Sequence, residues 1–219
     1  MTTRAFIPAA RFALLGPAYD LLCRWIGLGE RFRRFELELL AADSPKKVLE
    51  VGCGSGELLR RLAERFRKAE ITGLDIDPRM LDLARGKLPS ARKVRLECGT
   101  AEALPFPAAS FDLLLSSLML HHLDSATKRR ALADWRRVLA PEGTLVLIDF
   151  GVPRTRLARI IGWPLKFDLF EHQAENLRGR VPEMLLEAGF VFQEAGVFGG
   201  LVVAYRARPD PRDVGSITS

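Results

Sequence analysis

Three glycines separated by single residues follow directly on a short apolar run. The apolar run is 46–52, and the glycines are Gly52, Gly54 and Gly56. Glycines let a backbone turn sharply and approach a ligand where a Cβ atom would clash. A helix predicted to begin at Glu57 would direct its N-terminus at the same place, which favours a carboxylate or a phosphate. The spacing indicates a ligand-binding loop, although a tight turn without a ligand could have the same glycines.

An acidic residue stands at the end of the next apolar run. This run is 70–76, and it carries Asp75. In nucleotide-binding βαβ units, an acidic residue at this point takes the ribose hydroxyls. Asp77 precedes Pro78 and suits the N-cap of the next helix, which leaves Asp75 for the ligand. The loop and Asp75 together indicate a cofactor that contains a nucleoside.

Three histidines and one aspartate are the candidates for proton transfer. His121 and His122 follow the fourth predicted strand, and Asp149 ends the fifth. These ends meet at the carboxyl edge, where open α/β sheets bind ligands. His172 lies in residues 151–178, which are rich in arginine and aromatic side chains. Each of the four could act as a general base, and each could instead be a structural residue.

Strands and helices alternate in the part of the chain that must position these residues. The expected strands are 46–52, 70–76, 94–99, 111–118 and 144–150, and the helices between them are 57–68, 78–88 and 125–139. Runs that are apolar on both faces are typical of parallel strands covered by helices. The alternation predicts a doubly wound α/β sheet with right-handed crossovers. After a helix at 181–188, strands 190–197 and 201–208 are expected to form a hairpin through Gly199 and Gly200.

The 219 residues suit one medium domain with a small accessory segment. Residues 1–44 are expected to form an N-terminal helical lid, and residues 45–208 to form the ligand-binding domain. Within that domain, 151–178 lack a clear period and are expected to cover an acceptor pocket. Residues 209–219 are expected to be disordered.

Composition narrows the functional class. The three cysteines are far apart, so they predict neither a disulfide framework nor a zinc site, and no metal is expected. No apolar run reaches the roughly 18 residues that a membrane span needs, and we expect a cytoplasmic protein. The net charge of +6 permits an anionic partner such as RNA or a lipid headgroup, but it also describes an ordinary solvated surface.

Four segments resemble the successive motifs of class I S-adenosylmethionine-dependent methyltransferases. They are VLEVGCGSGE, GLDID, AEALPFPAASFDLLLSSLMLHHL and RVLAPEGTLVLIDF. They are most similar to the branch that methylates small molecules, quinones and lipids, and the resemblance covers residues 45–150. It implies a Rossmann-like sheet of seven strands, mostly parallel, with an antiparallel strand in the C-terminal hairpin. It also implies S-adenosylmethionine as the cofactor.

The resemblance implies roles for residues around that cofactor. The loop glycines would bring backbone against its methionine part, with Glu50 beside them. Asp75 would hold both ribose hydroxyls, and Ile76 would pack on the adenine. Thr100 and Ala101 would flank the adenine edge through backbone N–H and side-chain contacts.

Further positions follow less closely from the family pattern. Ser116 would lie near the sulfonium end of the cofactor, and Tyr19 and His172 are candidate contacts of the acceptor. The family often has an aspartate where Thr100 stands, and a threonine can accept a hydrogen bond from adenine only without charge assistance. Glu142 also departs from the pattern, within a turn where the family more often has Pro-Gly-Gly.

Residues 6–28 and 160–170 are rich in bulky apolar side chains interspersed with arginine. This composition predicts a small, hydrophobic acceptor such as a quinone or a lipid. It also predicts contact with an anionic membrane surface, because each nearby basic residue adds about 1 kcal/mol of attraction. Packing of these segments on each other would produce the same composition.

Competing functions remain open from the sequence. A nicotinamide dehydrogenase would have a glycine where Glu57 stands. An RNA or protein methyltransferase is permitted by basic clusters at 31–34, 128–130 and 154–159, although residues 116–118 carry no Asn/Asp-Pro-Pro-Tyr motif, so there is no firm nucleic-acid signal. A non-catalytic module that binds S-adenosylmethionine would keep the same glycines and Asp75.

Overall fold

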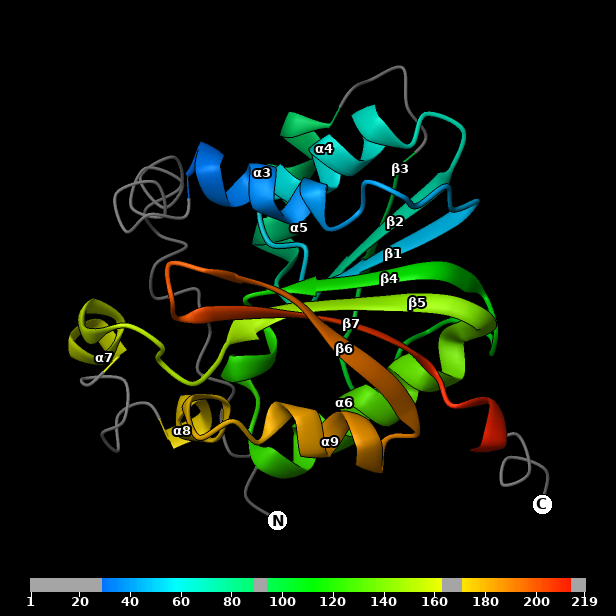
Figure 1. The fold of residues 1–219 in the computed structure, drawn as a ribbon. Coiled ribbons are helices and arrows are strands. Elements are labelled where there is room, and N and C mark those ends of the chain that lie inside the picture. Colours follow the sequence, from blue (N-terminus) through cyan, green and yellow to red (C-terminus); the bar gives the residue numbers. More distant parts are fainter. Residues whose placement is uncertain (1–28, 89–93, 163–170, 214–219) are drawn as a thin grey trace, which may run out of the picture.

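A seven-stranded sheet forms the centre of the protein, in the order β3-β2-β1-β4-β5-β7-β6 (Figure 1). The computed structural model describes residues 29–88, 94–162 and 171–213, with side chains for 29–88, 94–160 and 174–212. Among these residues the strands are β1 (Lys47–Val51), β2 (Glu70–Asp75), β3 (Val94–Cys98), β4 (Phe111–Ser117), β5 (Leu139–Phe150), β6 (Phe190–Phe198) and β7 (Val202–Pro209). All neighbouring strands are parallel except the two pairs that include β7. The predicted doubly wound fold and its antiparallel strand are confirmed.

Helices cover both faces of this sheet (Figure 1). One face carries α3 (Glu30–Glu38), α4 (Glu57–Arg65) and α5 (Pro78–Lys87), and the other carries α6 (Ser125–Val138) and α9 (Val181–Glu187). Shorter helical elements are η1 (Leu120–His122), α7 (Arg156–Gly162), α8 (Glu171–Leu177) and η4 (Pro211–Asp213). The order of strands reverses between β1 and β4, and ligands of open α/β sheets bind at the carboxyl edge at such a point.

The two faces of the sheet have separate apolar cores, and β4 contributes to both. Leu113 and Leu115 are buried in the core shared with α3 and α4, whereas Leu114 is buried in the core on the other face, which includes Trp135 of α6. Burying a leucine side chain contributes about 1.5–3 kcal/mol. The alternation therefore stabilises both layers, and it explains why β4 has an uninterrupted hydrophobic run in the sequence.

Capping and turn residues end the elements where the sequence indicated. The Asp77 side chain accepts a hydrogen bond from the backbone N–H of Arg79 (2.9 Å), so Asp77 is the N-cap of α5 as predicted. Asp124 caps α6 in the same way. Gly199 and Gly200 have φ angles of 59° and 71°, a left-handed conformation that favours glycine, and they are the central residues of a turn in which Leu201 N–H donates to the carbonyl of Phe198 (3.2 Å).

The boundary between α6 and β5 differs from the prediction. The helix was expected to reach residue 139 and to be ended by a turn at 141–143, but it ends at Val138 and β5 begins at Leu139. Leu139 pairs with Phe111, and the next pair is Thr144 with Leu113. Residues 140–143 thus lie opposite Asp112 alone, so β5 has three more residues than its partner strand at this point. The sequence suggested a turn because proline and glycine occur at turns and also at bulges.

Two other segments have more structure than expected. Residues 151–178, predicted to be irregular, contain α7 and α8. The Thr155 hydroxyl accepts a hydrogen bond from the N–H of Ala158 (3.0 Å) and caps the first turn of α7. The tail expected to be disordered from 209 begins with η4, which follows a hydrogen bond from Asp210 N–H to the carbonyl of Gly189 (2.8 Å).

The N-terminal segment, expected to be a helical lid over 1–44, is described from residue 29 onward, where it contains α3. Tyr19 lies outside the described residues. The rings of Phe32 and Phe35 lie 5.1 and 5.6 Å from that of Phe198 in β6, so α3 packs against the hairpin. No helix in the part of the chain that the structure describes is long and apolar enough to cross a membrane.

Candidate active site

The glycine loop between β1 and α4 uses its glycines in two different ways. Gly52, Gly54 and Gly56 have φ angles of 76°, 51° and 78°. A Cβ atom on Gly52 would lie 2.3 Å from Cγ of Met119, and one on Gly56 would lie 2.7 Å from Cβ of Ala84. A Cβ atom on Gly54 would meet no atom of the described residues within 4 Å. Gly52 and Gly56 therefore allow neighbouring chain to pack closely, whereas Gly54 exposes its backbone to open space.

Asp75 ties the loop to the end of β2. Its Oδ2 accepts a hydrogen bond from Gly54 N–H (2.8 Å), and its Oδ1 accepts one from Asp77 N–H (2.9 Å). Burial raises the pKa of Asp75, and the backbone hydrogen bonds oppose that rise. Each carboxylate oxygen can accept two hydrogen bonds, so the fixed carboxylate keeps acceptor positions for a ligand. Ile76 is exposed beside it.

Glu50 has a buried carboxylate with an unpaired oxygen. Its side chain is 3% exposed, and Oε2 has no hydrogen-bond partner among the described residues. Burial raises the pKa of Glu50 well above its usual value, and the charges of Glu36 and Asp75 raise it further, while Arg33 opposes them. Burying a carboxylate without a partner is costly. A cation beside the loop would remove this cost, and an ammonium group has the right charge and hydrogen-bond donors.

A second buried carboxylate comes from α3, outside the loop. Glu36 is fully buried, forms an ion pair with Arg33 (2.7 Å) and accepts a hydrogen bond from the Ser117 hydroxyl at the end of β4. Burial raises the pKa of Glu36 despite Arg33. The sequence interpretation missed this contact, which attaches α3 to the sheet edge beside Ser116.

The remaining residues assigned to the cofactor lie after β3 and in β4. Ser116 is fully buried, and its hydroxyl has no hydrogen-bond partner in the part of the chain that the structure describes. Thr100 is partly buried just after β3. Ala101 is buried, and its carbonyl accepts a hydrogen bond from Trp135 Nε1 (2.9 Å). The carboxyl ends of β1 to β4 therefore carry all the residues predicted to contact the cofactor.

His121 and Asp149 form a buried pair at the same edge. His121 Nδ1 lies 2.7 Å from Asp149 Oδ1, and His121 N–H donates to Oδ2 (3.1 Å). Burial alone would raise the pKa of Asp149, but the interaction with the His121 ring and the hydrogen bonds from the backbone N–H groups of Phe150 and His121 outweigh it and lower the pKa. Asp149 is therefore a carboxylate, and Nδ1 of His121 is its donor. This tautomer leaves Nε2 as a proton acceptor.

Neither of the other two histidines is seen to belong to this buried pair. His122 is exposed, and its ring centroid is 4.1 Å from that of His121. His172 belongs to α8, but its side chain lies outside the described residues. Within the described residues, no group of three or more His, Cys, Asp or Glu side chains could hold a metal ion.

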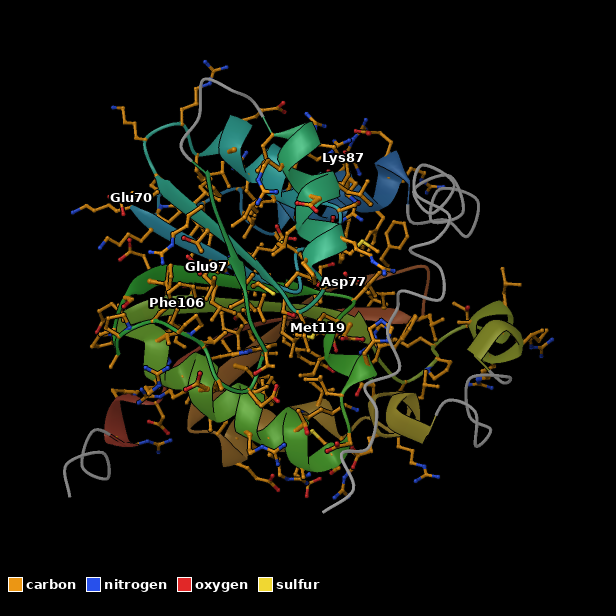
Figure 2. The ribbon with its side chains drawn as sticks, turned by 180° about the vertical axis from the view of Figure 1, so that it is seen from behind. Glu70, Asp77, Lys87, Glu97, Phe106 and Met119 are labelled. Carbon is orange, nitrogen blue, oxygen red and sulfur yellow. The ribbon has the colours of Figure 1, made fainter. Side chains whose placement is uncertain are left out.

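The glycine loop and the His121–Asp149 pair are adjacent. Met119, whose side chain lies against Gly52, directly precedes η1, which carries His121. Figure 2 shows Met119 and Asp77 at the carboxyl edge of the sheet, with Glu70 and Phe106 toward the opposite edge. A ligand on the loop would therefore lie near the pair.

The strand order, the glycine loop and the acidic residue after β2 define a class of protein, the class I S-adenosylmethionine-dependent methyltransferases. The family model described as a methyltransferase domain matches residues 48–143. An uncharacterised methyltransferase of Synechocystis is 32% identical over 180 residues, which cover 80% of this chain and 81% of that protein. The chain belongs to this methyltransferase family, as the sequence motifs predicted.

Relatives with named acceptors match over a shorter length. A demethylmenaquinone methyltransferase of Deinococcus radiodurans is 40% identical over 149 residues, which cover 67% of this chain and 61% of the relative. The chain thus spans about three fifths of that relative's length. A solved structure from Pyrococcus horikoshii has the same fold, with a TM-score of 0.64, 21% identity, and coverage of 84% of this chain and 93% of that one.

The unpaired carboxylate leads to a prediction for Glu50→Gln. Because burial raises its pKa in the folded state, folding takes up a proton, and stability falls as pH rises from the unfolded pKa of about 4.3. Glutamine removes this dependence. We expect the ligand-free variant to be about 1–2 kcal/mol more stable at neutral pH, because a buried unpaired charge is gone. Thermal unfolding from pH 4 to 8 measures both effects.

The same substitution should weaken the cofactor. Hydrogen bonds to charged groups contribute about 1.5–3 kcal/mol, so we expect S-adenosylhomocysteine to bind at least about tenfold more weakly. Glu64→Gln, at an exposed position of α4, is the matched control and should change neither stability nor affinity appreciably. Lower stability of Glu50→Gln with unchanged affinity would mean that Glu50 has a structural role only.

Proposed function

We propose that the protein transfers a methyl group from S-adenosylmethionine to a small, hydrophobic, quinone-type acceptor. The observation that carries this proposal is the buried His121–Asp149 pair beside the glycine loop, at the edge where ligands of such sheets bind. The relative from Deinococcus radiodurans, whose name gives demethylmenaquinone as its acceptor, supports a quinone-type substrate.

The residues around the loop fit the cofactor. Glu50 would accept hydrogen bonds from the ammonium group of its methionine part, and the open backbone at Gly54 would allow close approach. Asp75 would accept the ribose hydroxyls, and Ile76 would pack on the adenine, with Thr100 and Ala101 at its edge. When bound, the cofactor supplies an electrophilic methyl group on a positively charged sulfur. Ser116 would face that end.

His121 would act on the acceptor. A quinol must lose a proton when its carbon or oxygen is methylated, and a positioned base contributes about 10²–10⁴-fold to such steps. Nε2 of His121 would take this proton. Asp149 would hold the ring in the required tautomer and would stabilise the positive charge that the ring gains. Positioning of the acceptor against the methyl group would supply much of the remaining rate.

The acceptor would be covered by residues 1–44 and 151–178, with Tyr19 and His172 as contacts. In the second of these segments, α7 has Leu157 and Ile160 at 66% and 70% exposure, next to Arg156 and Arg159. Apolar and basic side chains together suit an anionic lipid surface. An acceptor dissolved in such a membrane could enter from this side.

An RNA acceptor fits the basic clusters less well. Lys128 is buried against α8, Arg129 forms an ion pair with Glu187 (2.8 Å), and Arg154 pairs with Glu194. These three basic side chains therefore have partners within the protein, which makes them poorer ligands for RNA phosphates.

The proposal is tested in two steps. Calorimetry should show binding of S-adenosylhomocysteine and none of NAD; the reverse result would make the protein a dehydrogenase. Labelled S-adenosylmethionine is then supplied with a demethylated quinol in anionic vesicles, and label should appear in the quinol. Binding without transfer to any quinol, or transfer to RNA or protein instead, would contradict the proposed acceptor.

A further inference from the structure

A buried carboxylate from α3 reaches the end of β4. Glu36 is fully buried, and its Oε1 accepts a hydrogen bond from the hydroxyl of Ser117, the last residue of β4. Arg33 donates to both oxygens of the carboxylate, at 3.0 and 2.7 Å. The contact joins residues that are 81 apart in the sequence. It brings a side chain of α3 to the carboxyl edge of the sheet, where the glycine loop also lies.

The charge of Glu36 is not needed to attach α3 to the sheet. The ring of Phe32 lies 5.1 Å from that of Phe198, and Arg206 of β7 donates to the carbonyl of Leu39 (2.7 Å) just after the helix. Replacing a buried ion pair by apolar side chains of similar volume is often neutral or stabilising. An apolar residue on this buried face of α3 would therefore pack at least as well. This points to a role for the carboxylate besides stability.

The strand end that Glu36 contacts leads directly to the glycine loop. Leu118, the residue after Ser117, has a φ angle of 51°, in the left-handed region that is costly for a leucine. Met119 follows, and its Cγ lies 2.3 Å from the place of a Cβ atom on Gly52. The chain thus turns sharply between its contact with α3 and its contact with the loop. A shift at Ser117 would reach the loop within two residues.

The two parts of the cofactor are assigned to different strands of the sheet. Gly52 after β1 and the buried hydroxyl of Ser116 in β4 are assigned to the methionine part and the sulfonium, and both are next to the contact made by Ser117. The nucleoside is assigned to Asp75 and to the residues after β3. Because β1 separates β4 from β2 and β3, a change at the end of β4 acts on the methionine part and not on the nucleoside.

We propose that Glu36 is a positioning residue for the methionine part of the cofactor, on which it acts through Ser117. The hydrogen bond fixes the end of β4, and with it the places of Ser116 and Met119. In this way α3 belongs to the binding site without touching the cofactor. The proposal rests on the placement of the cofactor in the proposed function and not on the identity of the acceptor.

Ser117→Ala removes the hydrogen bond and leaves the ion pair of Glu36 with Arg33 in place, so we expect a folded protein. S-adenosylhomocysteine should bind about tenfold more weakly, the effect of one lost hydrogen bond. Adenosine, which lacks the methionine part, should bind within about twofold of the wild type, because Asp75 lies on the far side of β1. Calorimetry with the two ligands measures this difference.

Two substitutions of Glu36 separate the hydrogen bond from the charge. Glu36→Gln keeps an oxygen that can accept from Ser117, and its affinity for S-adenosylhomocysteine should stay within about threefold of the wild type. Glu36→Met has no acceptor, so it should show the same loss as Ser117→Ala. The double variant should be no weaker than either single variant, since both remove one interaction. Additive losses would overturn the proposal.

Ser110→Ala is the matched control at the other end of β4. The Ser110 hydroxyl donates to the carbonyl of Pro107 (2.6 Å), so this variant also loses one hydrogen bond of a serine. It should change neither affinity. Equal losses for S-adenosylhomocysteine and adenosine in Ser117→Ala would mean that the contact serves the fold alone, which contradicts the proposal even if Glu36→Met does not fold.

The methyl resonance of Met119, assigned from Met119→Leu, gives a second readout in the ligand-free protein. Ser117→Ala and Glu36→Met should move this resonance, and Ser110→Ala should not. A wild type that binds no S-adenosylhomocysteine, with a moved resonance in Ser117→Ala, would contradict the proposed function but support the link from Glu36 to the loop. An unmoved resonance in variants of a protein that binds the ligand would overturn the link and leave the proposed function standing.

Discussion

Replacing Asp75 with alanine should weaken S-adenosylhomocysteine binding by about 2–4 kcal/mol, or about 30- to 1,000-fold. Two ribose hydroxyls would lose a charged acceptor in a partly buried site. The variant would also release Gly54 N–H, which Asp75 now holds at 2.8 Å. Both changes act on the place where the loop backbone is open to a ligand.

Asp82→Ala is the matched control for charge. Asp82 is an exposed carboxylate on α5, paired with Arg85 at 2.5 Å, and it makes no contact with the loop that the described structure records. Calorimetry on the two variants separates a local contact from a general loss of negative charge. Unchanged affinity in Asp75→Ala would show that this carboxylate only organises the turn through Gly54 and Asp77.

Thermal unfolding of the ligand-free Asp75→Ala protein completes this test. Burial raises the pKa of Asp75, so its charge is not itself stabilising in the folded protein. The loss of two backbone hydrogen bonds should lower stability by about 1–3 kcal/mol. A large fall in affinity together with cooperative unfolding would locate the effect at the ribose and not in the fold.

Local patterns were sufficient to predict most of the fold. Apolar runs separated by amphipathic segments specify parallel strands and covering helices. A strand with helices on both faces, such as β4, is apolar at every position, and the sequence shows this directly. Asp77 and the Gly199-Gly200 turn act within a few residues of the chain, so their roles could also be predicted. The start of β5 was missed because Pro141 and Gly143 mark turns as well as the extra residues of a strand.

Local sequence patterns do not predict the partners of the buried charged residues Glu36 and Lys128. Glu36 is four residues after Phe32 and four residues before Leu40, and all three are buried. Phe32 and Glu36 lie on one face of α3, and Leu40 lies just after the helix ends. Lys128 is similarly four residues before Leu132 in α6. A charged residue inside an apolar stripe is a signal that the sequence contains. The partner of Glu36 is Ser117, 81 residues away, and the partner of Lys128 is Asn176, 48 residues away. Neither partner could be predicted from residue spacing.

The arrangement of the candidate site was therefore predictable in part. His121 and Asp149 could be placed at the same edge of the sheet, because the carboxyl ends of β4 and β5 meet there. The contact between them, and the separation of His121 from exposed His122, depend on the path of η1. That path is set by Met119 against Gly52, which involves residues far apart in the sequence.

His121→Asn should lower turnover of the quinol by about 10²–10⁴-fold, the range typical of a lost general base. The asparagine amide can still donate to Asp149, which limits the cost of leaving a buried carboxylate without its partner. It has no basic nitrogen in place of Nε2, so proton removal fails. Affinity for S-adenosylhomocysteine should stay within about threefold of the wild type, because in the proposed function His121 acts on the acceptor and not on the ribose.

His122→Asn is the comparison that decides between the two neighbouring histidines. His122 is exposed, and Asp149 bonds to His121, so turnover in this variant should stay within about threefold of the wild type. The acid limb of the wild-type pH–rate profile should be retained in His122→Asn and be absent in His121→Asn. If His122→Asn loses turnover and His121→Asn keeps it, the exposed ring is the base. If both keep turnover, methyl transfer depends on positioning alone, and the pair of His121 with Asp149 serves to anchor η1 to β5.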